Sequence, residues 1–248
     1  MSNVNLIFPG QGSQFIGMGK DLFEHHSDSQ LLFKQANDIL GYSISDICFN
    51  GPEDTLNQTQ HTQVAIFILS ACIYQFFKGS EFSIDAIAGH SLGEITAYYA
   101  AGVLDFESAL KVVIKRGELM AEAAQASSGG MAAIIGLDID NVAKIVDSFD
   151  GVKIANFNSP VQYVISGSTD AVKDACTEFE KSGARRVVKL PVSGAFHSVQ
   201  MAPSVPKFRD YLENFTFNDA EFPIILNRSV EAVTDSALLK ENLPIQIE

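Results

Sequence analysis

A serine with glycines two residues to either side stands in "GHSLG", residues 89–93, directly after an apolar run. A G-x-S-x-G pattern between a buried strand and a helix is typical of the nucleophile elbow, a sharp turn that exposes the serine hydroxyl. The N–H of Leu92 would then lie at a helix start, where developing negative charge is stabilised. A purely structural turn is the alternative, but the strand before and the helix after favour Ser91 as a nucleophile.

A nucleophilic serine needs a base, and the chain has five histidines. His90 adjoins Ser91, and neighbouring side chains at a strand end point to different sides, so we interpret it as a structural residue. His197 follows an apolar strand in a glycine-bearing loop, where α/β sheets place functional groups. It is the candidate base, with a hydrogen-bonded core histidine as the alternative. The other three stand in polar stretches: His25, His26 and His61.

Arg116 falls one residue off the polar row of a helix predicted at 106–124. An arginine that faces an apolar row needs an anion or must extend its head to solvent. Its planar guanidinium suits a carboxylate, which belongs either to the protein or to a substrate. Its neighbours one helical turn away are Val112, Val113, Leu119 and Met120.

Gln11 stands in the turn "PGQGSQ", after a strand predicted at 4–8. Phe15 leaves the dinucleotide-binding pattern G-x-G-x-x-G incomplete. The carboxyl ends of parallel strands meet at one edge of a sheet. Gln11 is therefore a candidate to complete an oxyanion hole beside Ser91.

The elements that must position these residues alternate between strands and helices. A buried strand at 84–88 precedes Ser91, and a helix of small residues follows it and ends near Gly102. This order, with apolar strands of the parallel type, predicts an α/β sheet. Further elements are predicted as helices at 28–40, 63–77, 106–124 and 199–214 and as a strand near 224–227.

A second domain is predicted after "AQASSGG", residues 124–130, because the pattern of predicted strands and helices changes there. Its elements follow the order βαββαβ, the ferredoxin-like arrangement. We expect a ferredoxin-like domain, 125–190, inserted in an α/β-hydrolase-like catalytic domain formed by 1–124 and 191–248. The elements of the inserted domain are predicted at 131–137, 139–148, 152–157, 162–167, 169–182 and 185–191.

Composition narrows the function classes. The 248 residues, 46% of them hydrophobic, suffice for a sizeable core, and a net charge of −13 argues against nucleic-acid binding. Apolar runs fall short of the roughly 18 residues of a membrane span, and the N-terminus does not match a signal peptide, so we expect a cytoplasmic protein. Without a C-x-x-C pair zinc is not expected, and reduced, buried thiols are predicted for Cys48, Cys72 and Cys176.

Seven stretches, in order and at family-like spacing, resemble the malonyl-CoA:acyl-carrier-protein transacylase family of fatty-acid synthesis. The free-standing acyltransferases of polyketide synthases are similar. The matching stretches are "IFPGQGSQFIGMG" (7–19), "TQVAIF" (62–67), "AGHSLGEITAYYAAGV" (88–103), "KRGELM" (115–120), "GGMAAIIGL" (129–137), "ANFNSPVQYVISG" (155–167) and "LPVSGAFHS" (190–198).

The resemblance implies a role for each matching residue. Ser91 carries the acyl group as an ester, and His197 is its base and then the acid for the leaving thiolate. Arg116 pairs with the free carboxylate of malonate, and the backbone N–H groups of Leu92 and Gln11 form the oxyanion hole. The backbone carbonyl of Gln246 is implied to orient the histidine, and Gln63 and Asn156 are implied to line the cleft. Phe196 resembles a bulky residue associated with malonyl preference; the alternative is that it is simply a core residue.

The implied reaction is a ping-pong transfer of malonyl from coenzyme A, through Ser91, to the phosphopantetheine thiol of an acyl carrier protein. Malonyl-CoA and the carrier protein are the implied partners, with no bound cofactor, metal, nucleic acid or membrane. Such carrier proteins are usually acidic, so docking needs a basic patch; a solvated charged face is the alternative reading of any basic run. The densest basic run contains Lys181, Arg185, Arg186 and Lys189.

The chain departs from the family pattern near residue 248. The family continues for some tens of residues beyond the position of Gln246, with a strand, a turn and a closing helix, and Ile247 stands where an aromatic is common. We therefore expect truncation or completion by another chain, and a monomer for a full-length chain. Two other functions are considered. The first is a hydrolase that removes acyl groups from carrier proteins, which is disfavoured because such hydrolases tend to lack an arginine at the position of Arg116. The second is a non-catalytic paralogue that only binds the carrier protein.

Overall fold

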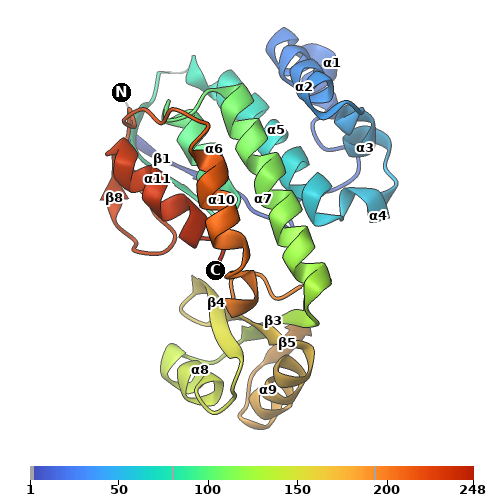
Figure 1. Cartoon of the computed structure of the whole chain (residues 1–248), viewed down its shortest axis with the longest axis vertical. Coiled ribbons are helices and arrows are strands. Elements are labelled where there is room, and N and C mark those ends of the chain that lie inside the picture. The colour runs from blue at the N-terminus through green and yellow to red at the C-terminus, as the bar shows by residue number, and fades with distance from the viewer. Residues whose placement is uncertain (1–2, 80, 193) are drawn as a thin grey trace. The chain divides into compact units, whose positions relative to one another are not determined.

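The computed structural model describes residues 3–79, 81–192 and 194–248 (Figure 1). Contacts between residues divide the chain into two units. The first comprises Met1–Glu118 and Phe208–Gln246, and the second comprises Leu119–Lys207 and Ile247–Glu248. Because a contact unit is no test of independent folding, the domain boundaries expected near residues 124 and 190 stay predictions.

The first unit is built on a four-stranded sheet in the order β1-β2-β7-β8. β1 (Asn3–Phe8) and β7 (Ile224–Ile225) both run parallel to β2 (Ser83–Gly89), and β8 (Ala232–Val233) is antiparallel to β7. The three parallel strands confirm the predicted α/β class. β7 pairs with the last third of β2, so the residues after β7 lie next to the turn after β2.

Helices cover the parallel strands of this unit (Figure 1). α6 (Gly93–Ala100) packs on β1 and β2, and α5 (Thr59–Lys78), most of whose residues are buried, packs on α6. Gly102, with φ 75°, follows α6 as the predicted C-terminal glycine. The other helices are α1 (Lys20–His25), α2 (Ser27–Leu40), α3 (Ile44–Asn50), α4 (Glu53–Leu56) and α11 (Ser236–Ile245), while α7 (Phe106–Ala126) and α10 (Ser204–Leu212) contribute residues to both units.

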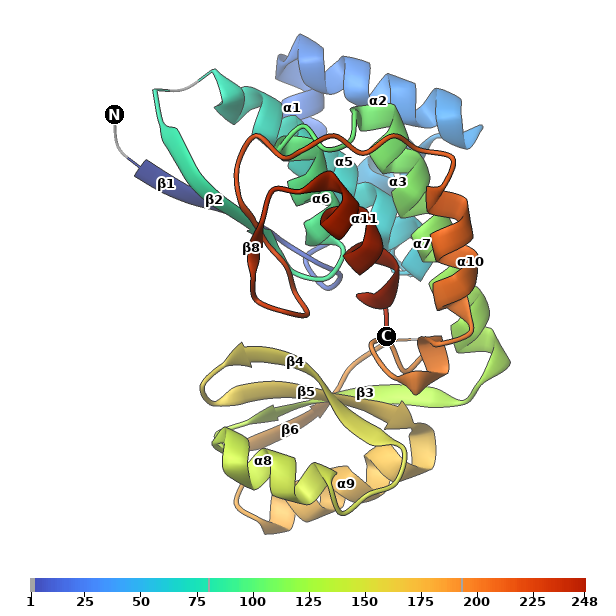
Figure 2. The ribbon, with the colours of Figure 1, turned by 60° about the vertical axis from the view of Figure 1, so that its left-hand side comes forward.

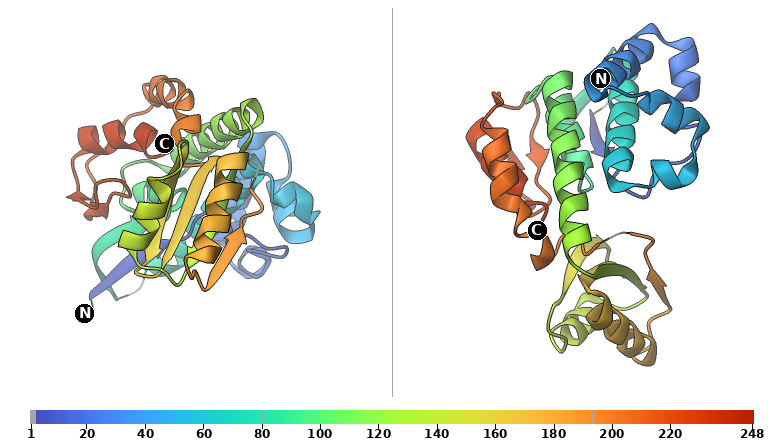
Figure 3. Two further views of the ribbon diagram at one scale, coloured as in Figure 1. Left: turned by 90° about the horizontal axis from the view of Figure 1, so that it is seen from below. Right: turned by 45° about the vertical axis from the view of Figure 1, so that its right-hand side comes forward.

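The second unit is a four-stranded antiparallel sheet in the order β4-β5-β3-β6, with two helices on one face (Figures 2 and 3). Apolar side chains, among them Ile134, Ile165 and Phe179, form its core. Asp138 and Ser168 cap the two helices by accepting backbone N–H groups. The predicted order βαββαβ is confirmed by β3 (Gly129–Ile135), α8 (Ile139–Val146), β4 (Val152–Ser159), β5 (Gln162–Ser168), α9 (Thr169–Lys181) and β6 (Arg186–Lys189).

Two predicted segments differ from the structure. In place of one helix at 199–214, the chain forms a 3-10 turn, η1 (Val199–Met201), and then α10. Pro203 explains the break, because proline has no N–H to donate back along a helix. His61, predicted in a polar loop, lies in the first turn of α5, which begins at Thr59.

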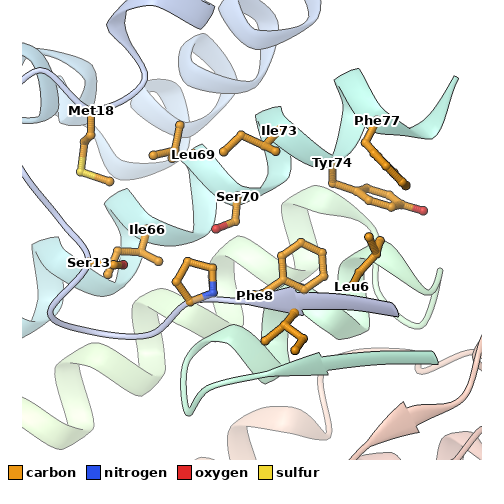
Figure 4. A pocket seen from close by; sticks show the side chains of 12 residues that line it. Leu6, Phe8, Ser13, Met18, Ile66, Leu69, Ser70, Ile73, Tyr74 and Phe77 are labelled. Carbon is orange, nitrogen blue, oxygen red and sulfur yellow. The ribbon is translucent and has the colours of Figure 1, made fainter. Parts of the chain in front are cut away.

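An apolar pocket of about 290 Å³ lies between β1 and α5 (Figure 4). Leu6 and Phe8 of β1 and Tyr74 of α5 are among the side chains that line it. Among the described residues, β1 has a strand partner on one side alone, and Ile7 on it is 77% exposed. An uncovered edge strand with apolar side chains favours association. Ser91 does not line this pocket, so the pocket is separate from the candidate chemistry.

Candidate active site

Ser91 stands in the turn between β2 and α6, and its backbone is left-handed, with φ 52°. This conformation is uncommon for a residue other than glycine and is found at functional turns. A Cβ at Gly89 would lie 1.9 Å from the carbonyl carbon of Gly93, and a Cβ at Gly93 would lie 2.3 Å from the Phe8 carbonyl oxygen. Only glycines permit this approach of helix and strand, so the predicted strand–turn–helix geometry is confirmed.

Arg116 is almost fully buried, with 1% of its surface exposed. Its Nη1 donates to Gln63 Oε1 at 2.7 Å, and its Nη2 donates to Ser91 Oγ at 2.9 Å and to Gln246 Oε1 at 3.0 Å. All three acceptors are neutral. Within the part of the chain that the structure describes, no carboxylate forms an ion pair with Arg116. The geometry thus favours a substrate carboxylate as its anion.

Burial sets the charges around Ser91. Desolvation lowers the pKa of Arg116 to about 10, opposed by the charge of Glu94, so Arg116 stays a cation at neutral pH. Desolvation also raises the pKa of Glu94 to about 7, opposed by the Asn227 N–H, the charge of Arg116 and the Tyr98 hydroxyl. The buried Nε of Arg116 has no hydrogen-bond partner among the described residues. A fixed cation with an unused donor is suited to receive an anion.

Gln246 lies directly after α11, and its side chain reaches the turn at residues 90–92, which holds the predicted nucleophile Ser91 and is called the nucleophile turn below. Its Nε2 donates to the Ser91 carbonyl oxygen at 2.6 Å. The expected role of its backbone carbonyl in orienting His197 stays a prediction, because His197 belongs to the other unit.

Two further residues of this site, Glu94 and Asn227, were not singled out from the sequence. The Asn227 Oδ1 accepts the Ser91 N–H at 2.7 Å, and its backbone N–H donates to Glu94 Oε2 at 2.8 Å. A lone carboxylate in a helix of small and apolar residues was the available signal for Glu94. No local pattern marks Asn227, which lies beside Ser91 because β7 pairs with β2.

The two predicted oxyanion-hole donors, Leu92 and Gln11, lie in the turn after β2 and in the turn after β1. Leu92 is buried at the start of α6, and Gln11 lies in the turn after β1. That turn packs on the nucleophile turn, because a Cβ at Gly10 would lie 2.4 Å from the His90 carbonyl oxygen. The His90 N–H also donates to the Phe8 carbonyl oxygen at 2.9 Å. The oxyanion-hole role itself stays a prediction.

His197 lies in a loop of the second unit with a left-handed backbone, φ 54°. Two hydrogen bonds fix this loop: Ser166 Oγ donates to the Phe196 carbonyl oxygen and Ser198 Oγ to the Ala195 carbonyl oxygen, both at 2.6 Å. The strained, tightly held backbone is consistent with a functional residue.

Other predicted site residues are placed by their own unit. Gln63 is buried in α5 of the first unit, whereas Asn156 is half-buried on β4 and Phe196 is buried, both in the second. Their cleft-lining roles, and the pairing of Ser91 with His197, stay predictions. The predicted docking residues are all exposed, at the end of α9, before β6 and on β6: Lys181, Arg185, Arg186 and Lys189.

The cysteines are not part of this site. All three are free and buried, which confirms the predicted buried thiols. Burial raises the pKa of Cys48 to about 12 and that of Cys72 to about 11, so both are thiols at neutral pH. Across the described residues, no cluster of His, Cys, Asp or Glu could hold a metal ion, and no helix is long and apolar enough to cross a membrane.

We expect the folded protein to resist thiol reagents. Because the thiolate is the reactive form and Cys48 and Cys72 are buried thiols, labelling by a disulfide reagent at neutral pH should be far slower in buffer than in denaturant. Mass spectrometry of labelled peptides measures each cysteine separately, with the unfolded protein as control. Rapid labelling of Cys48 in the folded protein would contradict its placement.

Comparison with known proteins places the chain in a family. The model of the acyl transferase domain family matches residues 6–242, so the chain belongs to this family. A malonyl CoA-acyl carrier protein transacylase of Bacillus subtilis (strain 168) is 41% identical over 100% of this chain and 79% of its own length. A polyketide biosynthesis malonyl CoA-acyl carrier protein transacylase of the same strain is 42% identical over 98% of this chain and 84% of its own length.

Solved structures agree with these relatives. An acyl carrier protein S-malonyltransferase from Vibrio cholerae has a TM-score of 0.94 and 39% identity, covering 100% of this chain and 82% of that one. A malonyl-transacylase in complex with a type II polyketide synthase acyl-carrier protein has a TM-score of 0.94 and 36% identity, covering 100% of this chain and 81% of that one. The resemblance to malonyl-CoA:acyl-carrier-protein transacylases and the mixed α/β fold are thereby confirmed.

Proposed function

We propose that the chain is a malonyl-CoA:acyl-carrier-protein transacylase of fatty-acid or polyketide synthesis. The hydrogen bond from Arg116 Nη2 to Ser91 Oγ carries the proposal, because it puts a buried cation beside the nucleophile. An acyl group that is esterified to Ser91 and bears a free carboxylate can place that carboxylate against the Arg116 guanidinium. A neutral acyl group would leave the buried cation without an anionic partner from the substrate. The names of the relatives support the malonyl group and the carrier protein.

In the first half-reaction, Ser91 Oγ attacks the thioester carbonyl carbon of malonyl-CoA. His197 accepts the hydroxyl proton as the new C–O bond forms. The N–H groups of Leu92 and Gln11 stabilise the oxyanion. The C–S bond then breaks, and the coenzyme A thiolate takes the proton from His197.

In the second half-reaction, the phosphopantetheine thiol of the carrier protein attacks the malonyl ester. His197 accepts the thiol proton, the C–S bond forms, and the bond to Ser91 Oγ breaks with return of the proton to the serine. Arg116 holds the malonyl carboxylate through both steps. Coenzyme A is a substrate here, and the scheme needs no bound cofactor.

We infer an α/β-hydrolase-like catalytic domain for the parallel sheet and a ferredoxin-like fold for the second unit. The strand–turn–helix around Ser91 supports the first assignment, and the order β4-β5-β3-β6 supports the second. A cytoplasmic location, and a monomeric state for a full-length chain, remain predictions of the same proposal.

Carrier-protein transfer tests the proposed function. The protein is mixed with malonyl-CoA and a phosphopantetheine-bearing acyl carrier protein, and the intact mass of the carrier is followed. We expect malonyl on the carrier and an equal release of coenzyme A, with no transfer to a carrier that lacks the phosphopantetheine. Release of free malonate without malonyl-carrier would indicate the hydrolase instead, and no turnover at all would indicate a non-catalytic binding protein.

Docking of the carrier is expected to depend on the exposed basic run of the second unit. Reversing the charge at both Arg185 and Arg186 to Glu should raise KM for the carrier protein roughly two- to tenfold, as expected for surface charge pairs. KM for malonyl-CoA should not change. Lys173→Glu, an exposed position on α9, is the matched control. An unchanged KM for the carrier in the double variant would refute this docking site.

A further inference from the structure

Asn227 contacts both sides of the nucleophile turn and the nucleophile itself. Its Oδ1 accepts the Ser91 N–H at 2.7 Å, and its Nδ2 donates to the Gly89 carbonyl oxygen at 2.6 Å. Its backbone N–H donates to Glu94 Oε2 at 2.8 Å. One residue, two positions after β7, thus joins the end of β2, the turn and the start of α6.

These bonds satisfy groups that the sheet leaves without ladder partners. Pairing between β2 and β7 ends at Ala88 and Ile225, so the Gly89 carbonyl has no partner on β7. Ser91, with its left-handed backbone, lies just before α6, where N–H groups have no partner within the helix and are satisfied by side chains; its N–H donates to Asn227 Oδ1. The primary amide of Asn227 supplies one acceptor and one donor at the positions where they are needed.

The same amide is connected to the substrate-binding cation. Gln246 Nε2 donates to Asn227 Oδ1 at 3.2 Å and to the Ser91 carbonyl oxygen at 2.6 Å, while Gln246 Oε1 accepts from Arg116 Nη2 at 3.0 Å. The link from Asn227 to Arg116 thus runs through Gln246, while Arg116 has direct hydrogen bonds of its own to Gln63 Oε1 and Ser91 Oγ, so loss of the Asn227 amide acts first on the turn.

We propose that Asn227 is a positioning residue, whose side-chain amide holds Ser91 in the left-handed conformation that presents Oγ. The proposal rests on the proposed function for its acylation readout but not for its geometry. The contact of Asn227 with Ser91 is through the backbone N–H and not through Oγ, so Asn227 acts through the placement of Ser91. Loss of its amide lowers the rate of attack by Ser91 rather than the affinity for the substrate.

The Asn227→Leu and Asn227→Asp variants keep a side chain of similar size at this position and change its hydrogen bonds, so they separate the effect of the bonds from the effect of the side-chain volume. Leucine supplies neither hydrogen bond, whereas an ionised aspartate supplies the acceptor without the donor to the Gly89 carbonyl. Protonation of that aspartate restores the donor. The charged and titratable groups around this position are Glu94 and Tyr98 of α6, Arg116 of α7, His90 of the turn and the adjacent Arg228. All variants share these groups, so the ratio of variant to wild-type rate removes their common contribution and reports the new carboxyl group together with its coupling to Glu94.

The test measures single-turnover acylation of Ser91 by malonyl-CoA between about pH 7 and pH 4, the range in which an aspartate at the exposed position 227, with Glu94 beside it, takes up its proton. We expect Asn227→Leu to be about 10- to 100-fold slower at every pH, for the two hydrogen bonds lost to the turn, of about 1 kcal/mol each. The longer bond from Gln246 Nε2 is lost as well, and KM should stay nearly unchanged. The ratio for Asn227→Asp should rise as the pH falls. Asn214→Asp, which makes the same charge change at an exposed position, is the control.

A fluorophosphonate, which labels activated serines regardless of acyl preference, provides a second readout. If the wild-type protein takes no malonyl but Asn227→Leu still slows phosphonylation of Ser91, the proposed function fails and the positioning role stands. The positioning role would be overturned if Asn227→Leu were phosphonylated and acylated at the wild-type rates. It would also be overturned if the ratio of variant to wild-type acylation rate were the same for Asn227→Leu and Asn227→Asp and did not change with pH.

Discussion

Replacing Arg116 by alanine is expected to remove most malonyl loading and to improve loading of acetyl. Arg116 is buried beside Ser91 Oγ, and among the described residues its hydrogen-bond acceptors are neutral, so we expect the malonyl carboxylate to be its anion. Each charge-assisted hydrogen bond lost costs about 1.5–3 kcal/mol, or roughly 10- to 100-fold in the loading rate. An acetyl group lacks the carboxylate and benefits when the buried cation is gone. Loading is measured as the mass of the intact protein after mixing with each thioester.

Acetyl loading also shows that the Arg116→Ala variant is folded. Arg209→Ala, which removes an exposed arginine of α10, is the matched control and should load malonyl like the wild type. Equal malonyl loading in Arg116→Ala and wild type would contradict the assignment of Arg116 to the carboxylate.

Replacing His197 by alanine is expected to slow acylation of Ser91 about 10²- to 10⁴-fold, the usual contribution of a general base. Binding of malonyl-CoA should persist, so the loss falls on the acylation rate and not on KM. Stopped-flow or quenched measurement of coenzyme A release gives both quantities. His25→Ala removes an exposed histidine of α1 and serves as the control. A His197→Ala variant that acylates at the wild-type rate would assign the base to another residue.

Local patterns in the sequence sufficed to predict two features that the structure shows, the sharp turn at Ser91 and the burial of Arg116. Ser91 follows from the glycine spacing and the elements that flank it, and the structure adds that the glycines at 89 and 93 are sterically required. Arg116 follows from its place off the polar row of its helix, and its burial is confirmed. In both cases the constraint lies within about one helical turn of the residue, which is why periodicity reveals it.

The support of the site could not be predicted in this way. Asn227 meets Ser91 across 136 residues of sequence, through a strand, β7, that is only two residues long. Gln246 reaches the same turn from a helix, α11, that was not predicted. Contacts set by sheet pairing leave no periodic pattern in the sequence, so they become visible only when the strands are placed.

Two short helices carry a local signal in the sequence, their capping residues. Ser43 and Asp235 each accept the backbone N–H three residues on, at the starts of α3 and α11. Serine and aspartate are favoured at this position because they satisfy a helix N–H that has no partner within the helix. Capping residues therefore marked both helices, although their apolar spacing is too brief to identify them.

The most direct test of the account is whether Ser91 carries malonyl. The protein is mixed with malonyl-CoA without carrier protein, its intact mass is measured, and the modified residue is located by peptide mapping. We predict one malonyl group on Ser91, absent from Ser91→Ala and discharged when phosphopantetheine-bearing carrier protein is added. An adduct that persists in Ser91→Ala, or no adduct in the wild-type protein, would contradict a Ser91 malonyl-enzyme.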